Sequence, residues 1–231
     1  MSIKKVGRRE ALGVMGAAGA GLAFGCGGSP TSPDTSTSST TTTGSTNAAC
    51  AVTPTETAGP YPSLTDMFRS DIRGGKTGTL LTLTVKVANV NAACAAVANA
   101  NVEVWHCDSA GNYSEYGTQT AQTYLRGIQT TNSNGEVTFT TIYPGWYQGR
   151  ATHIHLEVTI NGVSRKVTQI AFPESVNSAV YRTGVYASRG ANPTSNLSDG
   201  IFADSLSSER VTPSGNAASG YTASCQIGVS L

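Results

Sequence analysis

Hydrophobic and polar residues alternate along several short stretches of the chain. From 81 to 87, every odd position is leucine or valine, while the even positions are threonine or lysine. Residues 154–160 repeat this alternation strictly, and shorter alternations occur at 102–106 and 137–139. Because side chains on a strand point alternately to its two faces, a period of two residues predicts half-buried β-strands. Further strands are expected over residues 163–172 and 225–231.

Turn residues separate these stretches, and no segment shows the pattern of a long amphipathic helix. Asn161-Gly162 directly follows the strand that ends at Ile160, and this dipeptide is the strongest short signal for a β-hairpin. Short strands with glycine, asparagine and proline between them are typical of a sandwich. The sequence therefore predicts an all-β fold: a β-sandwich of mainly antiparallel strands with long loops that would carry an active site.

The composition favours an exported β-rich domain over a nucleic-acid-binding protein. Charged residues make up only 13% of the 231 residues, whereas glycine alone accounts for 26. Lysine and arginine together number 15 and aspartate and glutamate 14, so no excess of positive charge is available for a basic face. Recognition of a phosphate backbone depends on such a face. We therefore expect no nucleic-acid partner.

The first 26 residues have the pattern of an export signal. Basic residues, ending in the pair Arg8-Arg9, precede an uncharged run over residues 11–25. A positive segment followed by a short apolar one is typical of a signal peptide, and the arginine pair matches the twin-arginine type. Residues 22–26 resemble a lipoprotein cleavage site, which makes Cys26 a lipidation candidate and predicts attachment to a membrane. An ordinary cleaved signal is the alternative, and both place the protein in the periplasm or at the cell surface.

Residues 27–48 are rich in serine and threonine and lack large apolar side chains, so they predict a flexible linker before a domain over residues 49–231. Four cysteines remain beyond Cys26, and in an oxidising compartment they allow three pairings. We favour Cys50–Cys94 and Cys107–Cys225. A buried free thiol at Cys107 is the alternative.

Two histidines lie on the most regular of the predicted strands. His153 and His155 are two residues apart, so both imidazoles project from the same face, while Ile154 and Leu156 point to the apolar one. Two imidazoles on one face are half of a metal site, although the same spacing also arises from packing alone. The third histidine, His106, is expected to have a structural role.

The loop before the histidines supplies a second kind of ligand. Residues 143–152 contain Pro-Gly and a further glycine, so they predict a tight loop that places Tyr147 and Arg150 over the histidine face. A phenolate is a hard anionic ligand, and together with imidazole it suits ferric iron better than zinc or calcium. A trivalent ion would keep such a tyrosine ionised at neutral pH.

Four stretches of this chain together resemble the intradiol ring-cleavage dioxygenases, the family of protocatechuate 3,4-dioxygenase and catechol 1,2-dioxygenase. The similarity spans most of residues 50–230, and the ordered combination is far more specific than any single motif. The stretches are 53–61 (TPTETAGPY), 102–113 (VEVWHCDSAGNY), 125–145, which begins LRGIQT and ends TTIYPG, and 145–155 (GWYQGRATHIH).

The resemblance implies a non-haem Fe(III) cofactor and a reaction between a small aromatic diol and O2. It assigns Tyr113 and His155 as equatorial ligands of the iron, and Tyr147 and His153 as axial ones. Tyr147 would leave the metal and take a proton from the substrate, and Arg150 would stabilise the negative charge that develops. The expected product is a cis,cis-muconate-type dicarboxylic acid. The loop from Tyr147 to His153 is shorter here than in the catechol and protocatechuate enzymes, which indicates a more open pocket.

The resemblance also places Gly59, Pro60 and Tyr61 at the substrate pocket and Gln169 at the catalytic site. The position of Gln169 conflicts with simple counting. A regular hairpin at Asn161-Gly162 pairs Ile154 with Gln169, which turns the glutamine away from the histidines unless a β-bulge shifts the register.

Two other functions remain open from the sequence. The domain could be a non-catalytic β-sandwich binding module of an exported lipoprotein, with a structural metal site. A zinc hydrolase is a weaker alternative because no carboxylate is placed as a general base. Glu157 shares the histidine face, but a regular hairpin makes it the cross-strand partner of Lys166. The sequence indicates neither which diol is used nor the oligomeric state.

Overall fold

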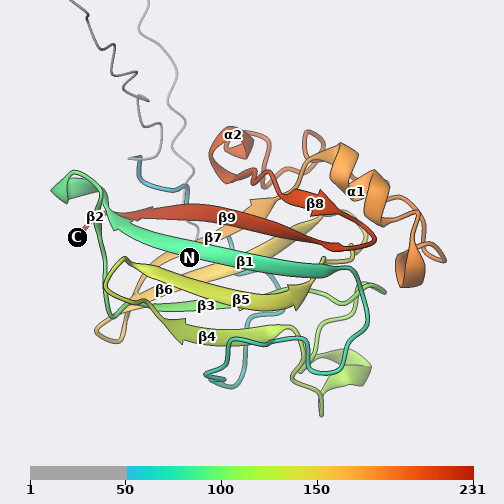
Figure 1. Cartoon of the computed structure of the whole chain (residues 1–231), viewed down its shortest axis with the longest axis horizontal. Coiled ribbons are helices and arrows are strands. Elements are labelled where there is room, and N and C mark those ends of the chain that lie inside the picture. Colours follow the sequence, from blue (N-terminus) through green and yellow to red (C-terminus); the bar gives the residue numbers. More distant parts are fainter. Residues whose placement is uncertain (1–50) are drawn as a thin grey trace, which may run out of the picture. The chain divides into compact units, whose positions relative to one another are not determined.

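The structure, a computed structural model, describes residues 51–231. The predicted signal peptide and linker, together with Cys26 and Cys50, lie outside these residues. Within the described part, no helix is long and apolar enough to cross a membrane. Two β-sheets are stacked face to face, and Figure 1 shows β1, β5 and β9 as one layer in front of β3, β6 and β7.

The first sheet is built around a long central strand that pairs antiparallel on one side and parallel on the other. The parallel pair, between β1 and β9, joins segments that are far apart in the sequence. In spatial order the strands are β2 (Ala95–Ala96), β1 (Leu80–Asn89), β9 (Gly220–Val229) and β8 (Ser214–Asn216), with β5 (Glu136–Ile142) also paired with β1.

The second sheet is antiparallel throughout and carries the two predicted histidine ligands on its outer face. Its order is β4 (Arg126–Thr130), β3 (Asn101–Trp105), β6 (His153–Ile160) and β7 (Val163–Ala171). The inner face of β6 contributes Ile154, Leu156 and Val158 to the core, where they meet Leu81, Leu83 and other residues of β1. The alternation seen in the sequence thus separates core from site on one strand.

Helices are few and short, as the sequence indicated. The two α-helices follow β7 and lie near one another along one edge of the sandwich, close to β8 (Figure 1). The α-helices are α1 (Glu174–Val180) and α2 (Leu206–Glu209), and single turns of 3-10 helix occur at Val90–Ala92, Gly117–Gln119 and Gly184–Tyr186.

The predicted all-β sandwich of mainly antiparallel strands is confirmed, with differences in detail. The last strand begins at Gly220 rather than at Cys225, and the strands β2, β4 and β8 were not predicted. The sequence of β4, RGIQT, starts with an arginine and a glycine and has no alternation. It becomes a strand because β3 pairs with it along its whole length.

A β-bulge in the β6–β7 hairpin overturns the register expected from regular pairing. Ile160 pairs with Val163 and Thr159 with Ser164, but Val158 then pairs with Lys166. Arg165 is therefore the extra residue. Beyond the bulge, each residue of β6 pairs with the β7 residue one position further along the chain than regular pairing predicts. The side chains in that half of β7 therefore point to the opposite face of the sheet.

The expected contact between Glu157 and Lys166 is wrong for the same reason. Glu157 lies opposite Val167 on β7 and opposite Glu103 on β3. Lys166 instead donates a hydrogen bond to the hydroxyl of Thr55, at 2.7 Å.

The favoured pairing of Cys107 with Cys225 is also wrong, because both are free thiols. Cys107 follows β3 of the second sheet and is buried against Trp105 and Tyr113, whereas Cys225 belongs to β9 of the first sheet. The alternative of a buried thiol at Cys107 is confirmed. Cys94 is disulfide-bonded, and the cysteine expected as its partner, Cys50, lies outside the described residues.

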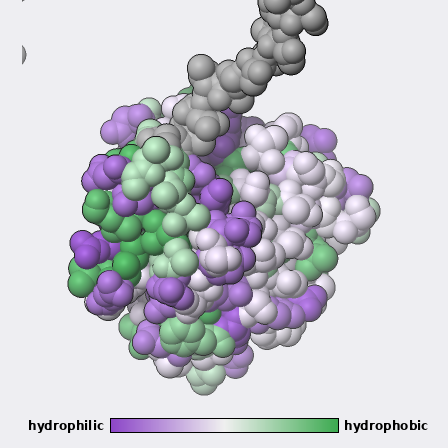
Figure 2. Space-filling model, turned by 60° about the vertical axis from the view of Figure 1, so that its left-hand side comes forward, coloured by the Kyte–Doolittle hydropathy of each residue, from purple (hydrophilic) through white to green (hydrophobic). Residues whose placement is uncertain are grey.

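Some large apolar side chains remain on the surface in separate segments of the chain. Figure 2 shows one face, on which hydrophobic residues gather toward the left with hydrophilic residues around them. Scattered exposure of this kind is normal for a folded protein. The most exposed of these side chains are Val52, Leu64, Phe68, Val163 and Leu197.

Candidate metal centre

His153 and His155 converge on the outer face of the second sheet. They lie at the start of β6, where loops cover them, so both side chains are buried. Their Nε2 atoms are 3.1 Å apart, and the rings are nearly perpendicular, at 79°. The prediction that both imidazoles share one face is confirmed.

The protonation of His153 is set by the chain just before it. Its Nδ1 lies 2.6 Å from the carbonyl oxygen of Ala151 and donates to it, which leaves Nε2 with a free lone pair. Burial lowers the pKa of His153 to about 3, so the ring is neutral at physiological pH. A neutral imidazole with one nitrogen oriented by a carbonyl is the usual form of a metal-binding histidine.

His155 is held by close packing around its ring. One face stacks on Trp105, its partner across the β3–β6 pair, with ring centroids 4.9 Å apart and an interplanar angle of 4°. Gly59 also approaches the ring, because a Cβ placed on it would lie 3.0 Å from Cε1 of His155. Gly59 also has φ +71°, so both its conformation and this close approach favour glycine.

The contact between the two histidines leaves a buried nitrogen without a partner. If Nε2 of His155 donates to Nε2 of His153, then Nδ1 of His155 is a bare acceptor, and it has no hydrogen-bond partner among residues 51–231. Buried polar atoms are normally satisfied. A cation that accepts both Nε2 lone pairs removes this conflict, because His155 then carries its proton at Nδ1. Burial lowers the pKa of His155 well below its usual value.

Tyr113 brings a second unsatisfied group to the same place. It follows β3 through a turn in which the carboxylate of Asp108 accepts the backbone N–H groups of Ala110 and Asn112. Only 3% of Tyr113 is exposed, and its hydroxyl has no partner in the described part of the chain. Burial raises the pKa of this phenol well above its usual value. A buried phenol without a hydrogen-bond partner is a further group that a bound cation would satisfy.

Tyr147 lies close to both His153 and Tyr113. Its ring centroid is 5.5 Å from that of His153 and 5.7 Å from that of Tyr113. Unlike Tyr113 it is partly exposed, and Arg150 donates a long hydrogen bond of 3.4 Å to its hydroxyl. Burial raises the pKa of Tyr147, while the Arg150 guanidinium acts in the opposite direction.

These four side chains fit a ferric ion by the chemistry of their donor atoms. Residues 51–231 contain no group of three or more His, Cys, Asp or Glu side chains able to hold a metal, so a cation here would depend on tyrosine. Phenolate oxygen and neutral imidazole together suit hard Fe(III). Burial by itself disfavours ionised tyrosine, and a trivalent charge reverses that preference.

Arg150 and Gln169 lie beside the four side chains. The bulge in β7 pairs Gln169 with His155, so the expectation that it faces away is wrong and the bulge alternative is confirmed. The Gln169 side chain is fully buried, accepts from Nη2 of Arg150 and donates to the carbonyl of Thr57 at 2.8 Å. Arg150 thus connects Tyr147 to Gln169.

The predicted pocket residues lie along the open side of the aromatic group. Tyr61 stacks on Tyr113 with ring centroids 4.7 Å apart and meets Tyr147 edge-on at 6.0 Å. Gly59 contacts His155, and Pro60 is exposed between Gly59 and Tyr61. The segment therefore borders the space in front of the four side chains.

Comparison with known proteins identifies the family of this chain. The family model described as Dioxygenase matches residues 57–188, more than half of the chain. The fold is similar to that of the intradiol ring-cleavage dioxygenase from Tetranychus urticae, with a TM-score of 0.70 and 28% sequence identity, over 78% of this chain and 95% of that one. The chain belongs to the intradiol ring-cleavage dioxygenase family.

Solved dioxygenases with lower sequence identity share the fold of this chain. The dioxygenase domain of a dioxygenase and carbohydrate-binding protein fusion from Streptomyces sp. SirexAA-E is 24% identical, with a TM-score of 0.60, over 78% of this chain and 99% of that one. Catechol 1,2-dioxygenase from Pseudomonas arvilla C-1 is 19% identical, with a TM-score of 0.57, over 77% of this chain and 62% of that one.

Two ion pairs that support the site were missed by sequence reasoning. Arg126, fully buried behind Tyr113, pairs with Glu115 at 3.3 Å and donates to the carbonyls of Tyr61 and Ser114. It thereby ties the pocket segment to the strand end that carries Tyr113. In the second pair, Asp199 accepts from Nε of Arg150 at 2.9 Å. The partners are far apart in the sequence, so no local pattern marks them.

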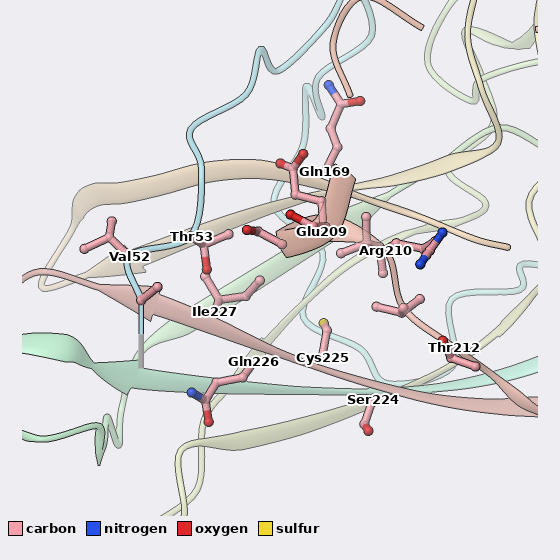
Figure 3. Close-up of a pocket in the computed structure, with 15 residues that line it drawn as sticks. Val52, Thr53, Gln169, Glu209, Arg210, Thr212, Ser224, Cys225, Gln226 and Ile227 are labelled. Carbon is pink, nitrogen blue, oxygen red and sulfur yellow. The ribbon is translucent and has the colours of Figure 1, made fainter. Parts of the chain in front are cut away.

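A separate cavity lies between β7, β9 and the segment around α2. It encloses about 500 Å³ and contains none of the four predicted ligands. In Figure 3, Cys225 and Thr53 point into this space, whereas the Gln169 side chain extends away from it. Gln169 therefore borders the cavity through its backbone and serves the aromatic site with its amide.

Proposed function

We propose that this protein cleaves a catechol-type aromatic diol between its two hydroxyl-bearing carbons, with O2 as co-substrate and non-haem Fe(III) as cofactor. Tyr113, Tyr147, His153 and His155 would hold the iron. The product would be a cis,cis-muconate-type dicarboxylic acid. The observation that carries the proposal is the unpartnered Tyr113 hydroxyl next to two converging imidazole nitrogens in a buried aromatic site.

Fe(III), when bound, would draw both substrate oxygens to itself and make the ring reactive toward O2. The protein contributes donors that are already fixed in place. The Ala151 carbonyl orients His153, and Trp105 with Gly59 clamps His155. Tyr113 is held between Tyr61 and the wall formed by Trp105 and Cys107. These groups need no reorganisation when the substrate arrives, which is how a site gains electrostatic preorganisation.

Tyr147 and Arg150 would manage the protons and charge of the substrate. A catechol carries two phenolic protons, and Tyr147, ionised by the bound metal, would accept one of them at its Oη. It sits in a loop, is partly exposed and has a single long hydrogen bond. Arg150, 3.4 Å from that oxygen, would stabilise negative charge on the diol. Positioned proton transfer of this kind contributes about 10²–10⁴-fold to a rate.

Oxygen consumption by the full chain tests the proposal. Iron-loaded protein is mixed with catechol, hydroxyquinol and protocatechuate in turn, and O2 uptake is compared with the mass of the product. Stoichiometric uptake with both oxygen atoms in a ring-opened diacid supports the reaction. Tyr221→Phe is the matched control, because it removes a tyrosine hydroxyl in β9, outside the site. No uptake with any diol would favour the non-catalytic binding module instead.

We also propose that the protein is exported and anchored through Cys26. The disulfide at Cys94 supports this, because structural disulfides are rare in reducing compartments. Membrane fractionation of cells producing the natural chain and Cys26→Ala tests the anchor. The natural protein is expected in the membrane fraction and the variant in the soluble one. Recovery of an uncleaved chain from the cytoplasm would contradict export.

A further inference from the structure

A buried carboxylate outside the matched family segment lies behind the arginine of the candidate site. Asp199 belongs to the loop before α2, beyond the residues 57–188 that the family model covers. Its backbone N–H donates to Ser195, and its Oδ1 accepts the N–H of Ile201 at 2.9 Å. Only 1% of its side chain is exposed. The carboxylate is therefore fixed by its own loop before it meets any site residue.

The other carboxylate oxygen holds two consecutive residues of the loop that leads to β6. Oδ2 of Asp199 accepts from Nε of Arg150 at 2.9 Å and from the backbone N–H of Ala151 at 2.7 Å. The carbonyl of the same Ala151 accepts from Nδ1 of His153. A charge-assisted bond in a site with so little solvent is stronger than a neutral one.

The bond to Nε decides where the rest of the guanidinium points. The group is planar and rigid, so fixing Nε and the side-chain stem fixes both terminal nitrogens. Nη1 then reaches the Tyr147 hydroxyl and Nη2 the Gln169 carbonyl oxygen. Without the carboxylate, the Arg150 side chain would keep two hydrogen bonds, the long one to Tyr147 and the one to Gln169, and it could turn toward solvent because 14% of it is exposed.

We propose that Asp199 is a positioning residue for the reaction, which holds the guanidinium of Arg150 in the plane that serves Tyr147 and Gln169. The inference rests on the proposed function. It assigns a role to the loop around Asp199, which the family match does not include. It also explains why the Asp199 carboxylate is buried beside Arg150, whose own proposed role is to stabilise charge on the substrate. The same carboxylate steadies the backbone that orients His153.

Substitution by an isosteric neutral residue tests the role. Asp199→Asn in the iron-loaded full chain is expected to lower kcat by roughly 10–100-fold, the range for residues that orient site groups, with KM changed by less than about three-fold. The visible charge-transfer band, which senses the Tyr147 oxygen, should shift. Asp204→Asn is the matched control, because it makes the same charge change on an exposed side chain of the same loop. It should alter neither.

A double-mutant cycle separates positioning from general stability. If Asp199 acts through Arg150, Asp199→Asn should cost less than about two-fold in an Arg150→Gln background, because the guanidinium is already gone. An equal loss of kcat in both backgrounds would mean that Asp199 only supports the fold, and would overturn the proposal. Should Asp199→Asn fail to fold, Asp199→Glu keeps the charge but displaces it, and an unchanged kcat and band there would equally overturn it.

Failure of the underlying function is recognisable separately. Natural protein that consumes no O2 with any diol refutes the proposed reaction, whatever its variants do. The position of Arg150 is then read from the charge-transfer band of the iron-loaded protein. A band that is the same in Asp199→Asn and Asp204→Asn would overturn the positioning role.

Discussion

Tyr113 and Tyr147 present the same phenol to the same space but are held in very different ways. Tyr113 is almost fully buried at a strand end, stacked on Tyr61 and backed by Trp105 and Cys107. Its hydroxyl has no hydrogen-bond partner in the described residues. Tyr147 is partly exposed in a loop and shares its hydroxyl with Arg150. The difference supports our proposal that one tyrosine would stay on the metal and the other would leave it.

The arginines behind the two tyrosines repeat the contrast. The guanidinium of Arg126 bonds to Glu115, Ser114 and the backbone of the pocket segment, so it holds these parts of the protein together. Arg150 is held on one edge by Asp199 and directs its other nitrogens at Tyr147 and Gln169. One guanidinium therefore holds the fold, and the other is the one that would serve the proposed reaction.

Removing the Tyr147 hydroxyl is expected to have the largest effect. Tyr147→Phe should keep its iron, because Tyr113 and both histidines remain, but lose roughly 10²–10⁴-fold in kcat as the proton acceptor disappears. Tyr113→Phe should instead lose iron. Metal content per chain and O2 uptake measure the two quantities. Near-normal turnover in Tyr147→Phe would break the distinction between the tyrosines.

Breaking the buried ion pair behind Tyr113 should mainly destabilise the fold. Glu115→Gln leaves the Arg126 charge buried without a counterion, which costs about 3–5 kcal/mol in the free energy of unfolding. Asp71→Asn is the control, because its pair with Arg73 is about half exposed and should contribute about 0–1 kcal/mol. Urea unfolding measures both. Equal losses would show that Arg126 does not depend on Glu115.

His106, which lies outside the candidate site, should make its own contribution to the pH dependence of stability. His106 has both ring nitrogens partnered, by the Cys107 carbonyl and the Thr141 hydroxyl, and burial lowers its pKa to about 4. The unfolded chain therefore binds a proton that the native protein does not. This contribution to stability is complete above pH 6.5 and is lost as the pH falls toward 4, on the order of 2–3 kcal/mol.

Unfolding free energies at pH 7 and pH 4.5, measured on the natural chain and on His106→Gln, check this sign. The carboxylates common to both proteins titrate alike, so the variant should lose less stability on acidification. An equal loss of stability in the two proteins would show that His106 does not contribute to the pH dependence.

The smallest expected effect comes from the glycine that touches His155. Gly59→Ala adds a strained positive φ, worth roughly 1–2 kcal/mol, and a Cβ against the imidazole. Gly162→Ala is the control, because it has a similar φ of +75° but open space around it. Both should lose similar stability in thermal unfolding. Only Gly59→Ala should weaken iron binding, and equal iron affinity would show that the contact is unimportant.

The parts of the site that were predicted from the residues alone are those set by local geometry. Strand alternation places His153 and His155 on one face, and the loop before them places Tyr147 and Arg150 nearby. Tyr113 came from the resemblance alone, because nothing local marks the end of β3 as part of the same site.

What the sequence did not reveal depends on contacts between distant segments. A hairpin signal at Asn161-Gly162 cannot show the extra residue Arg165, so counting placed Gln169 on the wrong face. Asp199 and Glu115 meet their arginines only after folding, and the free thiols of Cys107 and Cys225 follow from their places in different sheets. The strand β4 forms only because β3 is beside it.

The central claim is that two tyrosines and two histidines hold a ferric ion, and the visible spectrum of the iron-loaded full chain tests it most directly. Tyrosinate bound to Fe(III) absorbs visible light by ligand-to-metal charge transfer. The account predicts a coloured protein with one iron per chain, and no such band in the Tyr113→Phe, Tyr147→Phe double variant. A colourless iron-bound protein, or a band that survives in the double variant, would contradict it.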